Sequence, residues 1–313
     1  MKVFVAGASG VVGRHLIPQL VDAGHEVVAM TRSPDKTARL RALGAQPVVA
    51  DALDQPAVTA AVRQARPQAV VHQLTAIPVR TGVGKFDRIF AATNRLRTEG
   101  TDILLAAARA AGAHRFVAQS FCGWTYVRTG GPVKTEDDPL DPTPVRSFHQ
   151  SLDAVRYLEH AVLDARGLDG LVLRYGFFYG PGTAIAPDGQ IGELVAKRRF
   201  PIVGQGTGVW SFVHMTDVAS ATVAALERGP AGIYNIVDDD PAPLAQWLPA
   251  LAQALGAKPP RQVPAWLVRP VNEGVVVMTN DIRGASNAKA KHQLGWQPVY
   301  PSWRYGFQKG LTA

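Results

Sequence analysis

Three glycines recur at intervals of three residues near the start of the chain, in the segment Gly7-Ala8-Ser9-Gly10-Val11-Val12-Gly13. The segment separates a short apolar run, typical of a strand, from a run with helical periodicity. At such a junction the first glycine permits a tight turn, the second lets the backbone approach a pyrophosphate, and the third lets the helix pack closely. The free N–H groups of the helix start attract phosphate. The pattern predicts a dinucleotide site at Gly7, Ser9, Gly10, Val11, Val12 and Gly13; a glycine-rich turn without a ligand is the alternative.

The end of the second predicted strand distinguishes two dinucleotides. An acidic side chain there binds the ribose 2′-hydroxyl of NAD, whereas a basic one accommodates the 2′-phosphate of NADP. The sequence has Thr31, Arg32 and Ser33 at this place and no carboxylate. Because an arginine can hold a phosphate through two hydrogen bonds, these residues predict NADP(H). A solvated arginine at the start of a loop is the alternative.

Two residues after the third predicted strand extend the candidate cofactor site. Asp51 could accept a hydrogen bond from the adenine amino group, and Ala52 is predicted to lie beside it. Asp51 could equally be a capping residue together with Asp54. Both interpretations remain open.

Apolar runs that suit buried strands alternate with helical runs along the first half of the chain. Such alternation with short links indicates parallel strands joined by crossover helices, hence a doubly wound α/β domain. We predict this domain over residues 1–179, with residues 211–237 rejoining the sheet, and a smaller substrate-binding lobe over 180–210 and 238–313. The predicted strands are 2–6, 26–30, 47–50, 69–72, 115–118 and 171–174, and the longer helices are 11–23, 94–111 and 147–165.

Composition and charge narrow the function classes. The chain has 313 residues, 47% of them hydrophobic and 19% charged, which is the balance of a globular protein. Its net charge of +8 favours anionic partners, but the basic residues form no long run, so a phosphorylated cofactor is preferred to nucleic acid. A single cysteine, Cys122, excludes an intramolecular disulfide and a cysteine-built zinc site. No apolar stretch approaches the roughly 20 residues that span a bilayer. We expect a cytoplasmic protein with no metal, membrane or nucleic-acid partner.

Several further motifs resemble the extended short-chain dehydrogenase/reductase superfamily, and together they are typical of its NAD-dependent epimerase/dehydratase-like branch. They cover nearly the whole chain, and the resemblance implies a Rossmann domain with a small C-terminal substrate lobe. The motifs are Val49-Ala50-Asp51-x-x-Asp54, the segment 70–76, Asn94, Glu136-Asp137-Asp138-Pro139, Tyr179-Gly180-Pro181-Gly182, Phe212-Val213-His214-x-x-Asp217 and Leu294-Gly295-Trp296. With the position of the strand ends, the resemblance adds Leu74, Thr75, Ala76, Asn94, Ser120, Tyr175 and Phe177 to the predicted cofactor contacts.

The catalytic pair of the family is where this sequence departs from the pattern. The family has a Tyr and a Lys four residues apart on one helix, and the Lys lowers the Tyr pKa so that the hydroxyl can exchange a proton. Counting back from Glu159 places Ser151 at the Tyr position and Val155 at the Lys position. The resemblance therefore implies an atypical member that lacks this pair.

No residue near this position is an obvious replacement for the tyrosine. Histidine titrates in a useful range, but His149 could equally be a surface or capping residue. Ser151 could simply be a small residue that leaves space for a bulky substrate, and Ser120 could only hydrogen-bond the substrate or ribose. The candidate catalytic residues are Ser120, His149, Ser151 and Tyr175.

The first functional hypothesis is an NADPH-dependent ketoreductase that transfers hydride to a carbonyl of a bulky, aromatic or polycyclic small molecule, as a tailoring step of secondary metabolism. Aromatic residues in the predicted loops would suit such a substrate, with ordinary core packing as the alternative. A second hypothesis is a non-catalytic NADP(H) sensor, which would keep the glycine loop and Arg32 without an acid. A third is a nucleotide-sugar epimerase or dehydratase, which the absent Tyr–Lys pair disfavours. A homodimer is left open.

Overall fold

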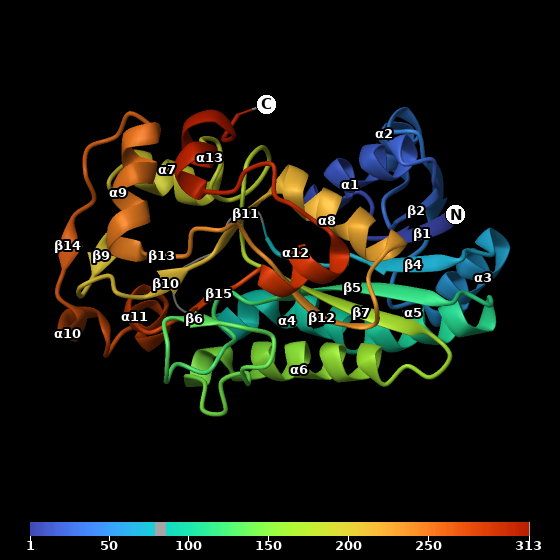
Figure 1. Ribbon diagram of the computed structural model, residues 1–313, viewed down its shortest axis with the longest axis horizontal. Helices are drawn as coiled ribbons and strands as arrows, with labels where there is room; N and C mark the ends of the chain where they lie inside the picture. Colours follow the sequence, from blue (N-terminus) through green and yellow to red (C-terminus); the bar gives the residue numbers. More distant parts are fainter. Residues whose placement is uncertain (79–85, 313) are drawn as a thin grey trace.

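The computed structural model describes residues 1–78 and 86–312 of the chain (Figure 1). Its centre is a seven-stranded sheet in the order β12-β7-β5-β4-β1-β2-β3, in which every neighbouring pair is parallel. The chain order reverses on either side of β1, which confirms the predicted doubly wound α/β fold. The strands are β1 Lys2–Ala6, β2 Glu26–Thr31, β3 Gln46–Val49, β4 Ala69–His72, β5 Arg115–Phe121, β7 Asp169–Tyr175 and β12 Gly232–Ile236.

Helices cover both faces of this sheet (Figure 1). On one face the apolar cluster joins α1, α2, α8 and α12 to the strands, and on the other it joins α3, α5 and α6. Covered on both faces, the central strands are largely apolar and buried, as β4 illustrates with four buried residues, three of them apolar. The helices are α1 Val11–Asp22, α2 Thr37–Ala42, α3 Gln55–Ala65, α4 Phe86–Arg97, α5 Glu99–Ala110, α6 His149–Leu163, α8 Met215–Glu227 and α12 Ala288–Leu294, with short 3-10 turns η1 Pro34–Lys36 and η2 Arg146–Phe148.

The prediction of one helix over 94–111 is wrong, because two helices, α4 and α5, occupy this region. The break falls at Thr98, whose ψ of −86° lies outside the helical range. Its hydroxyl donates to the carbonyl oxygen of Asn94 at 3.1 Å, and a hydroxyl that competes for backbone groups in this way disfavours a continuous helix. The break separates residues 91–98, which face the main cleft, from the helix that packs under β4.

The register of the parallel strands brings their carboxyl ends to one edge. Ala6 at the end of β1 lies opposite Met30 on β2 and His72 on β4, and His72 lies opposite Ala118 on β5. The loops that follow β1, β2 and β4 therefore begin side by side. This edge, at the point where the strand order reverses, is where ligands bind in open α/β sheets.

The remaining elements lie at one end of the sheet, on the left in Figure 1. Of the segment 211–237, β12 joins the seven-stranded sheet, whereas β11 pairs with β8 outside it. The division of the chain at residue 179 stays a prediction. Residues 79–85 and 313, which fall within the predicted segments, lie outside the described part. These elements are β6 Val133–Lys134, β8 Phe177–Tyr179, α7 Gln190–Ala196, β9 Ile202–Val203, β10 Val209–Trp210, β11 Phe212–His214, β13 Ala242–Pro243, α9 Leu244–Ala254, β14 Gln262–Val263, α10 Ala265–Val268, α11 Glu273–Asn280, β15 Gly284–Ala285 and α13 Trp303–Lys309.

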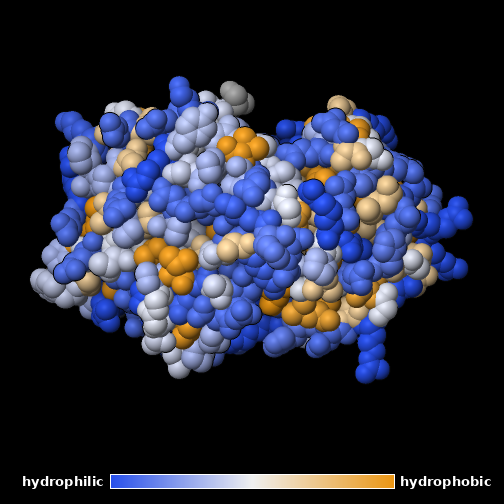
Figure 2. Space-filling view, in the orientation of Figure 1, coloured by the Kyte–Doolittle hydropathy of each residue, from blue (hydrophilic) through white to orange (hydrophobic). Residues whose placement is uncertain are grey.

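The surface and the interior differ as a globular fold requires. The face in Figure 2 is mostly hydrophilic, with apolar residues in separate small patches. In the described part of the chain, no helix is both long and apolar enough to cross a membrane.

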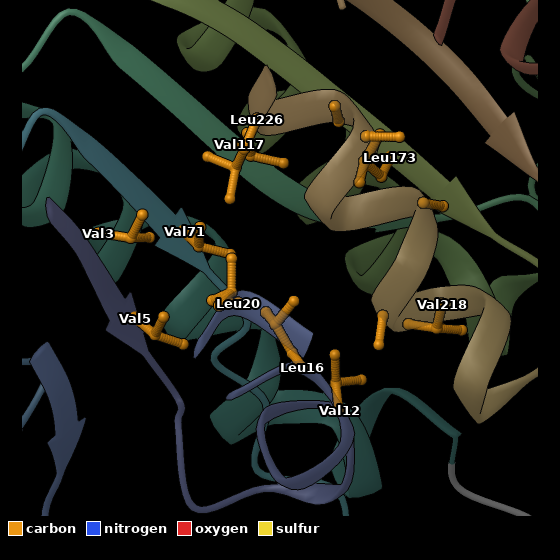
Figure 3. Close-up of a cluster of buried hydrophobic side chains, with 14 of the residues drawn as sticks. Val3, Val5, Val12, Leu16, Leu20, Val71, Val117, Leu173, Val218 and Leu226 are labelled. Carbon is orange, nitrogen blue, oxygen red and sulfur yellow. The ribbon is translucent and has the colours of Figure 1, made fainter. Parts of the chain in front are cut away.

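Leu16 on α1 tests the packing that holds this helix on the sheet. Figure 3 shows it among side chains from β1, β4 and α8, and it is fully buried. We expect Leu16→Ala to lower the free energy of unfolding by about 2–5 kcal/mol, because the lost contacts leave a cavity. Urea denaturation checks this, with the exposed Leu163→Ala on α6 as the matched control. An equal, small effect of both changes would contradict the packing described.

Candidate functional site

A cleft of about 1010 Å³ opens at the carboxyl edge of the sheet, between the loops after β1, β2, β3 and β4 and the helices α4 and α6. Its volume suits a dinucleotide-sized ligand better than a metal ion. In the described part of the chain, no group of three His, Cys, Asp or Glu side chains could hold a metal. The predicted cofactor residues that line the cleft are Gly7, Ser9, Gly10, Thr31, Arg32, Ser33, Asp51, Ala52, Leu74, Thr75, Ala76 and Asn94.

The three glycines of the first loop have different physical roles. Gly7 has a φ of +87°, and a Cβ there would lie 2.4 Å from the carbonyl oxygen of Gln73. A Cβ on Gly13 would lie 2.1 Å from the carbonyl oxygen of Ala8, so this glycine packs against the loop itself rather than against a strand. A Cβ on Gly10 would meet only one atom within 4 Å, the carbonyl oxygen of Gly7 at 3.2 Å. The backbone of Gly10 therefore faces the open cleft, where a side chain would obstruct a ligand.

The start of α1 completes this cradle. Gly10 is the N-cap residue and has no side chain to bond the first N–H groups of the helix. Val11 and Val12 form its first turn but do not line the cleft with their side chains. Their N–H groups, together with the helix dipole, suit a phosphate. The open space at Gly10 and these free donors fit the pyrophosphate of a dinucleotide.

Three polar side chains lie together at the end of β2. Arg32, Ser33 and Lys36 all line the cleft. The hydroxyls of Thr31 and Ser9 share a hydrogen bond of 3.1 Å, which links the end of β2 to the glycine loop. Lys36 is absent from the predicted site. A second basic residue four positions after Arg32 could have indicated a further contact with an anionic group. Two cations and a hydroxyl at one end of the cleft suit an anionic group.

Asp51 lines the cleft and belongs to the turn after β3, while its contact with adenine stays a prediction. Its side chain accepts from the N–H of Leu53 at 2.9 Å, and it also lines the cleft with Ala52. Asp54 does cap α3, because its carboxylate accepts from the N–H of Ala57 at 3.1 Å. Asp51 is thus held in place by the turn while facing the cleft.

A buried histidine shapes the end of β4. His72 Nδ1 accepts from the N–H of Leu74 at 3.2 Å, and Nε2 lies 3.1 Å from the hydroxyl of Thr101. Burial lowers the pKa of His72 to about 4, so the ring is neutral near pH 7. The next residue, Gln73, lines the cleft, and its buried Oε1 has no hydrogen-bond partner among the residues that the structure describes.

Ser151, which the sequence predicts at the family's tyrosine position, is hydrogen-bonded to two residues of α4. Its hydroxyl donates to Asp87 Oδ1 at 2.7 Å, and the N–H groups of Ser151 and Gln150 also donate to the Asp87 carboxylate at 3.0 and 3.1 Å. Asn94 Nδ2 donates to Ser151 Oγ at 3.2 Å. Because the serine proton is directed at the carboxylate, the Asn94 amide must present its Nδ2 to Ser151. Its Oδ1 is then left without a partner in the described structure.

The predicted catalytic residue Ser120 belongs to a buried charged network rather than to the cleft lining. Its hydroxyl donates to Glu159 Oε1 at 2.7 Å, and Glu159 forms two hydrogen bonds with Arg174, at 2.6 and 2.8 Å. All three residues are at least 95% buried. This arrangement ties α6 to β5 and β7.

The other candidates for the chemistry are also away from the cleft lining. Tyr175 is fully buried and bonded to Gln73 and Thr222, and burial raises its pKa to about 12. His149 is exposed at the start of α6 and lies 3.5 Å from Asp153. Phe177 stacks on Trp210 in the aromatic cluster of the C-terminal elements. The structure therefore does not bring His149, Tyr175 or Phe177 to the cleft.

Several residues that line the cleft are absent from the sequence-based site. Gln150, Asp153, Ala154 and Tyr157 come from one face of α6, at helical spacing counted from Gln150. The hydroxyl of Tyr157 donates to Asp102 at 2.7 Å. Asp87 had no signal in the local sequence, because its role depends on contact with a helix more than sixty residues away.

The sheet order, the glycine turn and the cleft define a doubly wound dinucleotide-binding α/β protein. A model of the NAD-dependent epimerase/dehydratase family matches residues 3–237. The chain therefore belongs to this family.

Similarity to individual proteins covers nearly the whole chain. The 3-diazoavenalumate denitrifying reductase of a Streptomyces species is 46% identical over 308 residues, which are 98% of this chain and 99% of that protein. The 4-hydroxy-2-methyl-3-oxo-4-farnesyl-3,4-dihydroquinoline-1-oxide ketoreductase of Stigmatella aurantiaca is 30% identical over 82% of this chain and 74% of that protein. The crystal structure of UDP-glucose 4-epimerase from Thermus thermophilus, in complex with NAD, matches with a TM-score of 0.75 at 25% identity, covering 99% and 98% of the two chains.

The depressed pKa of His72 predicts a pH-dependent stability. Between pH 6.5 and about 4 the unfolded chain binds a proton at this residue that the folded chain does not, so stability falls as the pH falls through this window. From pH 7.5 to 5 we expect wild type to lose about 2 kcal/mol more unfolding free energy than His72→Gln. Urea denaturation at both pH values measures the difference, with the exposed His160→Gln as control. Equal losses in wild type and His72→Gln would contradict a neutral buried imidazole.

Proposed function

We propose that the protein is a nicotinamide-dependent reductase that prefers NADPH and passes a hydride to an activated small molecule. The observation that supports this most directly is the presence, on α6, of residues that line a dinucleotide-sized cleft next to a buried Ser151 hydroxyl whose proton is directed at Asp87. Such a site is suited to a hydride transfer that needs no proton from this position.

Different residues along the cleft would hold different parts of the cofactor. The backbone at Gly10 and the first turn of α1 would hold the pyrophosphate, and Asp51 would accept from the adenine amino group. Arg32, Ser33 and Lys36 would hold the 2′-phosphate of NADPH. When bound, the reduced nicotinamide would supply the hydride, and the rest of the chemistry depends on what the acceptor requires.

Two hydride acceptors are compatible with the site. A ketone in a bulky aromatic or polycyclic molecule is one, and the similarity to the Stigmatella ketoreductase favours it; its oxyanion would need a proton from water or from the substrate. A diazo group is the other, favoured by the 46% identity to the Streptomyces denitrifying reductase. In that reaction one hydride replaces dinitrogen on carbon, R–N₂⁺ + H⁻ giving R–H + N₂, so no protein proton is consumed.

The other two hypotheses receive less support. Epimerase and dehydratase reactions on nucleotide sugars use a tyrosine to move a proton, and Ser151 and Val155 offer no such group. A non-catalytic NADP(H) sensor would use the same cleft and differs from a reductase only in the absence of turnover.

Removing the cations at the end of β2 tests the preference for NADPH. We expect Arg32→Ala to raise the dissociation constant for NADPH about 10- to 100-fold, because a charge-assisted pair is lost, and to leave the affinity for NADH nearly unchanged. Lys36→Ala should have a smaller effect in the same direction. Nicotinamide fluorescence titration measures both, with Arg63→Ala on the exposed face of α3 as control. Tighter binding of NADH than NADPH by wild type would overturn the assignment of Arg32.

Turnover tests the reductase itself. NADPH oxidation is followed at high protein concentration with a panel of quinones, polycyclic ketones, simple ketones and aromatic diazo compounds. We expect oxidation with at least one acceptor, and a loss of less than about tenfold in Ser151→Ala, because this hydroxyl gives no proton. Single replacements of Ser120, His149 and Tyr175 follow; a loss above about a thousandfold from one of them would place the proton donor there instead. Cofactor binding without oxidation across the panel would favour the sensor.

A further inference from the structure

Aromatic side chains gather around Phe86, the residue before Asp87 at the start of α4, and the later turns of this helix line the cleft. The ring of Phe86 lies 4.3 Å from that of Phe90, 4.7 Å from Phe148 and 5.2 Å from Trp124, measured between centroids. Phe86 and Phe90 are only partly buried, so their rings retain accessible area. Asp87 is the residue next to Phe86 and is itself partly buried.

The same group of rings continues toward the carboxyl ends of β5 and β7. Phe121, at the end of β5, lies 6.4 Å from Trp124 and 5.2 Å from Phe177. Phe121 and Phe177 are also partly buried. These ends lie on the same edge of the sheet as the cleft. We call the half-buried rings of Phe86, Phe90, Phe121 and Phe177, with Trp124 and Phe148 behind them, the aromatic cluster.

The negative charge of Asp87 is held in place by neutral groups. Its carboxylate accepts from two backbone N–H groups and from the Ser151 hydroxyl. Within residues 1–78 and 86–312, no lysine, arginine or histidine forms an ion pair with it. A carboxylate beside accessible aromatic faces is the combination that attracts an organic cation, because the faces of the rings also carry negative potential.

We infer that Asp87 and the aromatic cluster form a substrate subsite that selects a cationic nitrogen group, of the diazonium class, over a neutral ketone. This inference rests on the proposed reductase function and adds the charge of its substrate. A diazonium group loses its positive charge when it accepts the hydride and releases N₂. The carboxylate therefore attracts the charged substrate but not the uncharged product. A ketone instead develops a negative oxygen, which a nearby carboxylate destabilises.

Hydrogen bonds lead from Asp87 through Ser151 to Asn94, which lines the cofactor cleft. Their directions are consistent with a preference for a positively charged substrate. Ser151 turns its proton away from Asn94, a residue that lines the cleft, and the buried Asn94 Oδ1 has no partner within residues 1–78 and 86–312. This chain of hydrogen bonds ends on the Asp87 carboxylate and leaves no free hydroxyl proton on Ser151, which is fully buried, whereas the family's tyrosine would present a donor. Asp87 acts as a specificity-determining residue, and Ser151 and Asn94 act through it as positioning residues.

A pair of probes that cannot react tests the subsite without turnover. (3-Hydroxyphenyl)trimethylammonium and 3-tert-butylphenol have the same shape and differ in charge. In calorimetric titration of the protein saturated with NADPH, we expect the cation to bind at least about tenfold more tightly than the neutral probe. In Asp87→Asn this preference should fall to about threefold or less, while the neutral probe and NADPH bind as in wild type. Asp164→Asn, at the exposed far end of α6, should leave the preference unchanged.

A second variant keeps the test decisive if Asp87→Asn weakens the start of α6 and fails to fold. Phe90→Leu keeps the apolar bulk and removes one aromatic face, so it should reduce the preference for the cation several-fold and leave the neutral probe unaffected. Equal affinity of wild type for the two probes, or an unchanged preference in both variants, would overturn the subsite. If no diazo compound or ketone led to NADPH oxidation, the proposed reductase function would be overturned instead. The binding measurement would still decide, independently of that result, whether the subsite prefers a cation.

Discussion

The parallel register of the central sheet is the constraint on which the site depends. With Ala6, Met30, His72 and Ala118 in line, the chain leaves four neighbouring strands at one edge. Each crossover helix then begins near that edge and points its free N–H groups toward it. The glycine turn after β1 brings the start of α1 close to the strands, which a side chain at Gly7 or Gly13 would prevent by contact with backbone atoms. The cleft is therefore a consequence of the topology, and local side chains decide what it binds.

The position of α6 depends on a second interaction, the buried pair of Arg174 and Glu159. Burying two charges is costly unless their hydrogen bonds are well satisfied, and here the guanidinium meets both carboxylate oxygens while Ser120 donates to one of them. Removing one partner would leave an uncompensated charge in the core, which typically costs about 3–5 kcal/mol. This pair fixes the helix that carries Ser151 near its start and Tyr157 near its middle. Ser120 thus has a structural partner that explains its burial without a catalytic role.

The direction of the Ser151 proton, toward Asp87, bears on the chemistry that we propose. A site that directs its hydroxyl at a carboxylate is poorly suited to stabilise a developing oxyanion and well suited to a positively charged acceptor. The relatives span both kinds of reduction, a ketone and a diazo compound. The fold itself is shared with an epimerase structure, so the differences among these proteins lie in a few side chains on a common frame.

Much of the framework follows from the sequence alone. The spacing of Gly7, Gly10 and Gly13, the apolar strands and the cap at Asp54 are local patterns whose geometry involves residues only a few positions apart. They predict the doubly wound fold and, together with the family resemblance, twelve of the 26 described residues that line the cofactor cleft, including Arg32. The break at Thr98 was missed, because helical periodicity continues through it and only the backbone angles reveal the turn.

The substrate end was decided by the tertiary structure. Tyr175 and Arg174 are adjacent in β7, yet successive side chains of a strand point to opposite faces, so one packs against α8 and the other reaches Glu159 on α6. Asp87 and Ser151 are separated by 64 positions, and their hydrogen bond exists only because α4 and α6 pack side by side. Local pattern determines which residues form the helices and turns, whereas the direction of a proton or a charge depends on contacts between distant segments, which no local spacing encodes.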